Sequence, residues 1–556
     1  MIQKLTPYIY LLFFIVFSDG ILSQNLTLKI TSKDSLEKTV LSKVHFLKKH
    51  SLKKPLLREI DTVSNQLKQL GYFTNSIDSV SKKDSTYTAY FSLGIKIGKA
   101  VITLPYGFEI QNQKFKIQNK HLYCDIQDIS FLLKLISNQL EKKGASFSKV
   151  SLKKIHLKGN ILFAELDMYQ SKKRIINKVI VRGYDKFPKS FIKHYLNIRK
   201  NTVFNQQKLI EISSSIKLLH FVSEIKPPEI LFSKDSTSLY IYLKKEKRNT
   251  FDGLVSFTSK KNKKGALLNG HIDLKLNNIL HSGENFELFW KSNGEEKQQF
   301  TISTEIPYIF NSAFTPTISF SLYKHDSTFL NTNFHSGISY NLNPKSHISL
   351  TYESEGSKNL LQNKENSNVK DFNNSFLGLQ FSYRIPNKNN FNDSFYLKIN
   401  PSFGNRITNN KKIPQFKIDF ETAILWRLNY RNSIYIRNQT GYLHSADFLK
   451  NEIYRIGGTN SIRGFSEESI FTSQYSFLNL EYRYSTSLDS YFYTITDFGK
   501  IKTINSKQNT LTGLGLGYLF RVSNSQINLG YVLGKTSSEA FRFNKSKILI
   551  KIQSYF

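Results

Sequence analysis

The stretch GGTNSIRGFSEES, residues 457–469, places an arginine among glycines and small polar residues near the end of a 556-residue chain. The stretch is too polar and too rich in glycine to form a strand, although strand-like segments lie on both sides of it. Glycine lets a backbone bend tightly, and a guanidinium that leaves bulk water needs an acceptor. We therefore expect a long loop that folds back and carries Arg463 to a partner.

Alternating apolar and polar residues surround this loop from residue 249 to the end of the chain, with turns rich in Asn, Gly, Ser and Lys between them. Such alternation is typical of strands that have two different faces. We expect sixteen strands, at 249–259, 265–279, 284–293, 297–306, 315–324, 332–343, 346–355, 373–385, 393–405, 415–429, 432–444, 473–486, 491–501, 509–522, 525–534 and 546–556.

The connections between these segments favour a membrane barrel over a soluble sandwich. Taken alternately, one set is short, as at 281–283 and 523–525, and the other is longer and more polar, as at 360–372 and 407–414. Outer-membrane barrels sort their connections in this way, and a sandwich has no reason to do so. We expect residues 249–556 to form an all-β transmembrane barrel of about 16 antiparallel strands.

The region before the barrel has a mixed pattern that repeats three times. Each repeat has an amphipathic helix followed by alternating strands, and the helices are expected at 56–73, 131–144 and 209–221. A repeat of roughly 75 residues predicts three small α+β domains. We assign these domains to residues 24–100, 101–173 and 174–248.

The N-terminus has the pattern of a secretory signal over residues 1–23. Lys4 precedes an apolar run of roughly ten residues, which small and polar residues follow. This run is too short to span a bilayer as a helix, and no cysteine follows it that could carry a lipid anchor. We expect the mature chain to leave the cytoplasm.

The chain carries a formal net charge of +36, and most of the excess lies before residue 249. No helix-turn-helix, RNA-binding or zinc motif accompanies this charge, so we expect no nucleic-acid partner. Codon bias toward Lys and Asn is one explanation of the charge. Attraction to anionic lipid headgroups or acidic clients is another, and both stay open.

Catalytic chemistry has little support in the sequence. The chain lacks a Gly-x-Ser-x-Gly elbow, and histidines such as His45 and His50 are not at metal-binding spacing. The single cysteine, Cys124, excludes an internal disulfide and a cysteine zinc site, and we interpret it as a small core residue. We therefore expect neither enzyme activity nor a metal or cofactor.

Three short segments and the terminal residue resemble those of the BamA/TamA-type family of outer-membrane assembly proteins. IRGF at 462–465 resembles the family's signature in its sixth extracellular loop, normally Val-Arg-Gly followed by Phe or Tyr. ITDFG at 495–499 resembles its Asp-x-Gly motif on strand thirteen, and LNNILHSGENFEL at 276–288 resembles its second hairpin. The chain also ends in Phe556, as these barrels usually do. The resemblance covers essentially the whole mature chain.

The resemblance implies POTRA domains followed by a sixteen-stranded barrel. Three POTRA-like units match the layout of TamA better than the five of typical BamA proteins. They also differ from the two units, preceded by a plug helix, of two-partner secretion transporters. The implied location is the bacterial outer membrane, with the N-terminal domains in the periplasm.

The resemblance also assigns site residues. The loop motif comprises Ile462, Arg463, Gly464 and Phe465, and the strand-thirteen motif comprises Asp497 and Gly499.

Two carboxylates are candidates for the acceptor of Arg463. The resemblance points to Asp497. The residues themselves also allow Glu481, because it alternates with Leu480 and Tyr482 and should therefore face the lumen. We expect Arg463 to pair with one of the two, and its replacement by Ala to loosen the loop and lower assembly activity.

In the family, POTRA domains hold clients by strand addition, and the first and last barrel strands meet at a seam that opens sideways. Here the seam would join 249–258 to 548–556, and a disulfide between Phe251 and Ile550 would test it. The C-terminal strand signal is expected to comprise the outward-facing Ile548, Ile550 and Ile552 and the terminal Phe556.

The resemblance thus implies a factor that assembles, inserts or translocates proteins. Its implied partners are unfolded outer-membrane protein clients, outer-membrane lipids, and periplasmic or lipoprotein accessory subunits. A two-partner-secretion-type exporter of one specific secreted protein is the alternative. A passive porin would leave the three N-terminal domains unexplained.

Overall fold

The computed structural model describes residues 26–108, 110, 114–234, 236–259, 266–293, 297–361, 368–387, 392–504 and 508–556. The expected signal segment, residues 1–23, lies outside the described residues. The chain divides into two compact units, Met1–Arg174 with Val203–Asn205 and Ile175–Thr202 with Gln206–Phe556. Among the described residues, no helix is long and apolar enough to cross a membrane.

The first α+β domain is built around one amphipathic helix. Its elements are β1 (Leu26–Thr31), α2 (Ser35–Leu41), β2 (Lys49–His50), α3 (Lys53–Gln69), β3 (Ser76–Lys83) and β4 (Thr86–Ser92). The sheet order is β2-β1-β4-β3, with β1 parallel to β4. Leu56, Ile60, Val63 and Leu67 recur at helical spacing on α3, so that one face of the helix is buried in the domain core.

The second domain follows the same plan, with a hairpin in place of the first helix. Its elements are β5 (Lys99–Thr103), β6 (Lys116–Gln118), β7 (His121–Asp125), η1 (Ile126–Asp128), α4 (Ile129–Lys142), β8 (Lys149–Lys158) and β9 (Ile161–Tyr169). The sheet order is β6-β7-β5-β9-β8, with β5 parallel to β9. Because β5 starts at Lys99, this domain begins before the expected boundary at residue 101.

The third domain has the smallest sheet. Its elements are β10 (Lys178–Arg182), the short π-helix η2 (Phe191–Tyr195), α5 (Gln206–Ile216), β11 (Val222–Phe232) and β12 (Thr237–Lys245), in sheet order β10-β12-β11. In all three domains, the strand that opens the domain lies parallel to the strand that closes it. A parallel pair needs a crossover connection, which explains why a helix separates the two strands each time.

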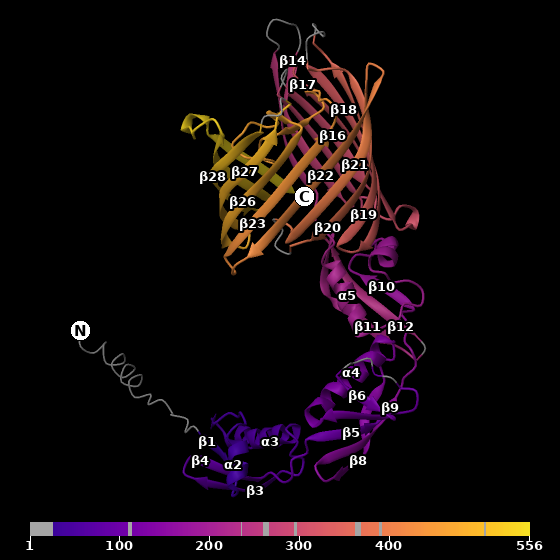
Figure 1. Cartoon of the computed structure of the whole chain (residues 1–556), viewed down its shortest axis with the longest axis vertical. Coiled ribbons are helices and arrows are strands. Elements are labelled where there is room, and N and C mark those ends of the chain that lie inside the picture. The colour runs from indigo at the N-terminus through magenta and orange to yellow at the C-terminus, as the bar shows by residue number, and fades with distance from the viewer. Residues whose placement is uncertain are drawn as a thin grey trace, which may run out of the picture. The chain divides into compact units, whose positions relative to one another are not determined.

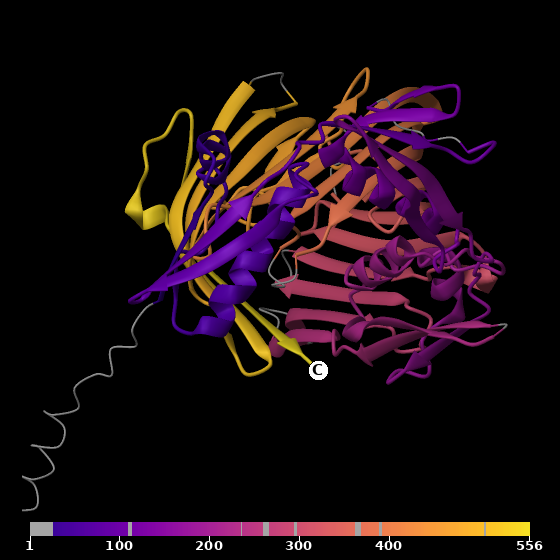
Figure 2. The ribbon, with the colours of Figure 1, turned by 90° about the horizontal axis from the view of Figure 1, so that it is seen from below.

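Sixteen antiparallel strands close into a barrel after the third domain, as the sequence predicts (Figures 1 and 2). The strands are β13 (Thr250–Ser259), β14 (Ala266–Asn277), β15 (Asn285–Asn293), β16 (Lys297–Glu305), β17 (Phe314–His325), β18 (Phe329–Asn343), β19 (Ser346–Asn359), β20 (Phe372–Ile385), β21 (Phe395–Thr408), β22 (Lys411–Arg427), β23 (Asn432–His444), β26 (Gln474–Ser487), β27 (Ser490–Lys502), β28 (Gln508–Val522), β29 (Ser525–Thr536) and β30 (Lys547–Tyr555). We call the end of the barrel where β13 begins the near rim, and the opposite end the far rim.

The expected long connection at 407–414 is wrong. β21 continues to Thr408 and β22 starts at Lys411, so only Asn409 and Asn410 form the turn, both at positive φ. Asparagine tolerates this left-handed backbone, and two such residues make a tight hairpin turn. The polar residues of 407–414 resemble a loop, but they pair as ladder residues at the far rim.

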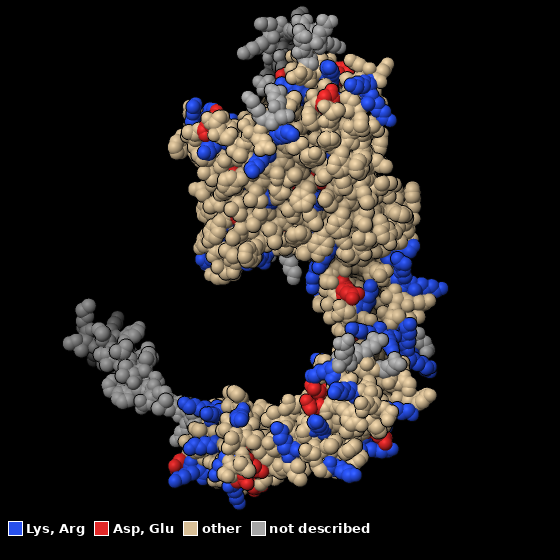
Figure 3. Space-filling model, viewed as in Figure 1, with Lys and Arg blue, Asp and Glu red and all other residues tan. Residues whose placement is uncertain are grey.

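The outer face of the barrel is apolar. Figure 3 shows a broad band over the strands with few Lys, Arg, Asp or Glu side chains, whereas charged side chains gather near the two rims. Exposed outward residues on this wall include Leu350, Leu377, Leu379, Phe403 and Leu516. Apart from the short pairing between β13 and β30, the strands pair with a neighbour along both edges, so their backbone polar groups are satisfied within the sheet, as a hydrocarbon environment requires.

The long far-rim connection between β23 and β26 folds against the inner wall of the barrel. It contains a two-stranded hairpin, β24 (Tyr454–Ile456) and β25 (Ile470–Thr472). Ile456 and Ile462 of this connection share a buried apolar cluster with Tyr475, Phe477 and Leu511 of the wall. This cluster holds the quoted stretch, residues 457–469, inside the barrel.

Candidate functional site

Glycines shape the tip of the inward loop. Gly457, Gly458 and Gly464 all have a positive φ, which other residues rarely adopt. The amide of Gly458 donates to the carbonyl of Ile462 at 3.1 Å, which closes a tight turn directly before the arginine. The loop therefore presents Arg463 from a fixed backbone instead of from a flexible end.

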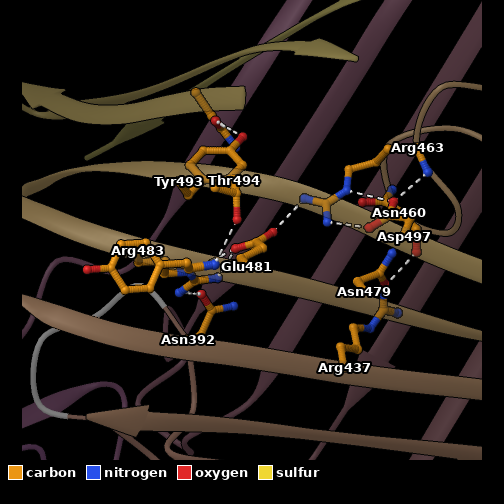
Figure 4. Close-up of polar contacts among 12 residues, drawn as sticks. Asn392, Arg437, Asn460, Arg463, Asn479, Glu481, Arg483, Tyr493, Thr494 and Asp497 are labelled. Atoms are coloured by element: carbon orange, nitrogen blue, oxygen red, sulfur yellow. Dashed lines mark hydrogen bonds and ion pairs between the residues drawn. The ribbon is translucent and has the colours of Figure 1, made fainter. Parts of the chain in front are cut away.

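Arg463 binds both candidate carboxylates (Figure 4). Its Nη2 lies 2.6 Å from Oδ1 of Asp497, and its Nε and backbone N–H donate to Oδ2 at 2.9 and 2.8 Å. Its Nη1 donates to Glu481. Asp497 is completely buried, and Arg463 and Glu481 are each less than a tenth exposed. The sequence left the acceptor open between two residues, and the structure uses both.

A second arginine completes the cluster. Arg483 donates through Nε to the other oxygen of Glu481 at 2.8 Å, and its guanidinium lies 4.2 Å from the ring centre of Tyr435. The four side chains of Arg463, Arg483, Glu481 and Asp497 therefore balance two positive charges with two negative ones. A buried ionic network is stable only when its members are paired in this way. In the part of the chain that the structure describes, no group of three or more His, Cys, Asp or Glu could hold a metal ion.

The motif's backbone lies against glycines of the barrel wall. A Cβ on Gly513 of β28 would collide with the carbonyl oxygen of Arg463. Gly464 and Gly534 of β29 approach so closely that a Cβ on Gly464 would lie 2.8 Å from the Cα of Gly534. The predicted Gly499 makes room for a side chain of the motif, because a Cβ there would lie 2.9 Å from Cδ1 of Ile462.

Sequence analysis missed two of these three wall glycines. Gly513 lies in the run TGLGLGY at 512–518, and Gly534 lies near the end of β29. Glycine inside a strand often marks the close approach of another backbone, and this signal was present in both strands. The strand pattern alone does not say what approaches.

The remaining motif residues contribute apolar contacts. Ile462 is completely buried, and Phe465 packs against the same apolar cluster. The motif thus has an apolar residue on each side of the Arg-Gly pair, so that the arginine enters the wall between two hydrophobic contacts.

A second ionic contact holds the part of the β23–β26 connection that precedes the arginine motif. Arg406 of β21, only 1% exposed, pairs with Glu452 and Asp447, which both belong to the β23–β26 connection. Gln415 of β22 donates to the other oxygen of Glu452 at 2.5 Å. No sequence motif marks these residues. A single arginine in an alternating strand and an acidic residue in a loop are too common to be paired without the fold.

The arginine cluster and the last strand line one cavity. Its volume is about 290 Å³, and its walls include Arg463, Glu481, Lys551 and Gln553. Lys551 and Gln553 thus face the lumen, whereas Ile548, Ile550 and Ile552 are exposed on the outer face of β30, as predicted. The anchored loop therefore lies beside the inner face of the strand that closes the barrel.

The seam between the first and last barrel strands is short. β13 pairs with β30 at two positions, Thr250 with Tyr555 and Phe251 with Ser554, both at the near rim. The amide of Phe556 adds one backbone hydrogen bond to Asn249. On their other sides, β13 pairs with β14 along its whole length and β30 pairs with β29 over most of its own. Within the described residues, no other residue of β13 pairs with β30.

The fold is similar to those of solved structures at low sequence identity. CdiB from Acinetobacter baumannii matches with a TM-score of 0.54 and 16% identity, over 90% of this chain and 97% of that one. CdiB from Escherichia coli matches with a TM-score of 0.51 and 14% identity, over 89% of this chain and 98% of that one. BamA from Haemophilus ducreyi, lacking POTRA domains 1-3, has a TM-score of 0.45 and 13% identity, over 77% and 93%.

No family model and no curated protein matches the chain. The structural likenesses show the fold, which is a set of α+β domains followed by a closed barrel of the outer-membrane type. The predicted fold class is confirmed. The closer likeness to the layout of TamA stays a prediction.

Proposed function

We propose that this chain, which has the fold of outer-membrane barrels with N-terminal α+β domains, inserts client proteins into the outer membrane or passes them across it. In this proposal the near rim faces the periplasm, and the three α+β domains lie in the periplasm. The observation that carries the proposal is the seam, because two residue pairs join β13 to β30 in a barrel whose other strand pairs are long. A strand edge that opens sideways can template a client strand by backbone pairing.

The α+β domains offer strand edges for the earlier step, in which a client is held. β3 and β8 are edge strands of the first and second sheets, and β10 is an edge of the third. The other edge of the third sheet, β11, contains Pro227 and Pro228, which lack the backbone N–H that pairing needs. Client strands would therefore add at β3, β8 or β10, and not along the middle of β11.

The anchored loop stabilises one side of the barrel wall. Arg463 ties the loop to β26 and β27, and the wall glycines bring its backbone against β28 and β29. Movement is then confined to the side where β30 meets β13. The role is non-catalytic, since a gate works by conformational change and breaks no covalent bond.

A disulfide across the seam tests the proposal. The predicted crosslink partner of Phe251, Ile550, is wrong, because on β30 Phe251 pairs with Ser554. The register therefore selects Phe251→Cys with Ser554→Cys, in a Cys124→Ser background. Directly paired residues on antiparallel strands are close enough for a disulfide.

The matched control uses the other neighbour of the same residue. Phe251 also pairs with Leu274 of β14, so Phe251→Cys with Leu274→Cys locks a hairpin that the proposal leaves closed. We expect the seam disulfide to abolish client assembly until it is reduced, and the hairpin disulfide to leave assembly unchanged. Full activity with an oxidised seam would rule out lateral opening.

A dedicated exporter of one secreted protein is the second candidate. It is supported by the similarity to the two CdiB structures over about nine-tenths of the chain. Depletion of the protein, followed by comparison of the outer-membrane and secreted proteomes, separates the two roles. Loss of many barrel proteins indicates a general assembly factor, and loss of one secreted species indicates the exporter. Accessory subunits would be identified by crosslinking at the α+β domains.

A further inference from the structure

A cavity lies where the third α+β domain meets the near rim of the barrel. Its volume is about 670 Å³. The domain contributes η2, the residues after it and the outer side of α5, and the barrel contributes the end of β18 and the turn that leads into β19. This site is separate from the arginine cluster inside the barrel.

Specific contacts fix the walls of this cavity. His194 of η2 bonds through Nε2 to the backbone oxygen of Asn311 at 2.9 Å, and its ring stacks on Tyr308. Tyr308 also meets Phe191 edge to face and accepts a hydrogen bond from Asn341 at 2.8 Å. The ring of Tyr308 is buried between the domain and the barrel. Specific side-chain contacts between the domain and the barrel therefore define the walls of the cavity.

The charged residues that line the cavity are mostly cationic. Arg199, Lys208 and Lys345 line the cavity together with one carboxylate, that of Glu211. Lys208 donates to the backbone oxygen of Leu196 at 3.0 Å, and burial lowers the pKa of its ammonium group. Three cations against one carboxylate give the cavity a net positive charge, which favours an anionic occupant that can accept charge-assisted hydrogen bonds.

The other side of the cavity continues into the apolar outer face of the barrel. Tyr340 and Leu342 of β18 line the cavity and are about half exposed, on the same face as Ile338. Phe310, at the nearby near-rim turn, is 96% exposed. Exposed aromatic residues at a barrel rim are typical of the level at which lipid headgroups lie.

We propose that this cavity binds the phosphate headgroup of a phospholipid, with the acyl chains along the outward face of β18. The lipid would belong to the periplasmic leaflet, and this part of the inference rests on the orientation given in the proposed function. The occupant is a lipid and not a soluble anion, because the cationic lining and the lipid-facing surface form one continuous site.

Native mass spectrometry of the full-length protein in detergent, incubated with phosphatidylglycerol, measures the binding. The test variant carries Arg199→Glu and Lys345→Glu. The control carries Lys189→Glu and Lys200→Glu, which make the same charge change at exposed residues of the same domain that do not line the cavity. We expect the test variant to retain about fivefold less lipid than the wild type, which corresponds to a loss of about RT ln 5 in binding free energy. We expect the control to retain as much lipid as the wild type.

Two further arms identify the source of the anion. Diacylglycerol, which lacks the phosphate, should not be retained, and excess inorganic phosphate should not displace the bound phospholipid. Equal retention by test and control variants would overturn the inference, as would displacement by inorganic phosphate. Heat-modifiable migration checks that each variant has a folded barrel. Lipid retention does not depend on the seam, so failure here is distinguishable from failure of the disulfide test.

Discussion

The wall from β26 to β29 and the seam between β13 and β30 differ strongly in how many contacts stabilise them. The wall carries a neutral cluster of four buried charged side chains, two glycines in close contact with the loop backbone and a third in close contact with the side chain of Ile462. The seam has two residue pairs at one rim. Breaking a buried ion pair costs about 3–5 kcal/mol, whereas a single hydrogen bond contributes about 1 kcal/mol.

This difference teaches where the molecule can move. A barrel opens at its weakest strand pair, and the energy needed is set by the ladder that must be broken. The anchored loop adds stability to the wall and none to the seam. Each experiment below either weakens the wall toward the level of the seam or measures the seam directly.

Replacement of Arg463 by Ala should have the largest effect. It leaves the completely buried carboxylate of Asp497 and the buried Glu481 without this partner, and we expect a loss of about 3–5 kcal/mol in barrel stability. Urea-dependent loss of heat-modifiable migration measures the change, and client assembly should fall with it. Arg542→Ala, at an exposed arginine of the β29–β30 connection, is the control and should change neither. Wild-type stability of the Arg463→Ala variant would contradict the role of Arg463 as an anchor of the loop.

Replacement of Arg406 by Ala should have a smaller effect, of about 3 kcal/mol. Its partner Glu452 is buried, but Asp447 is 62% exposed and can be solvated when the arginine is lost. The same unfolding measurement applies. Limited proteolysis within residues 445–453 should become faster, because this part of the loop is no longer held by Arg406. Arg427→Ala, at an exposed residue of β22, serves as the control. No change in proteolysis would mean that Arg463 alone holds the loop.

Replacement of Gly513 by Ala tests the close approach of the loop backbone. The added Cβ collides with the carbonyl of Arg463, and we expect a loss of about 1–3 kcal/mol from the required shift. Gly530→Ala is the matched control on the neighbouring strand, because its nearest atoms lie at an ordinary 3.5 Å. The control should stay within about 0.5 kcal/mol of the wild type. Equal stability of the two variants would contradict the predicted contact.

Hydrogen exchange of the unmodified protein measures the smallest energies, those of the seam. Amides of β13 that face β30 beyond Phe251 should exchange with opening free energies near zero, whereas amides in the middle of β28 should be protected by several kcal/mol. Mass spectrometry after proteolysis reports both segments in one sample. Equal protection of the two strands would show that the seam is a closed ladder in solution.

Much of the fold could be predicted from local pattern. Alternation along a strand depends only on neighbouring residues, so the number of barrel strands was predictable. The inward direction of Glu481 followed in the same way from its alternation with Leu480 and Tyr482. The amide-rich run 407–414 misled the same reasoning, because a tight turn of Asn409 and Asn410 and a long polar loop have similar composition.

By itself, the sequence determined the order of the domains, the strands and their faces, and the presence of a charged loop that needs an acceptor. Only the tertiary structure decided that Arg463 uses two carboxylates, that Gly513 and Gly534 receive its backbone, that Arg406 forms a second anchor, and that Phe251 meets Ser554. The physical reason is register. Contacts between residues far apart in the chain depend on how each strand is shifted against the next around the closed barrel, and local periodicity carries no information about that shift.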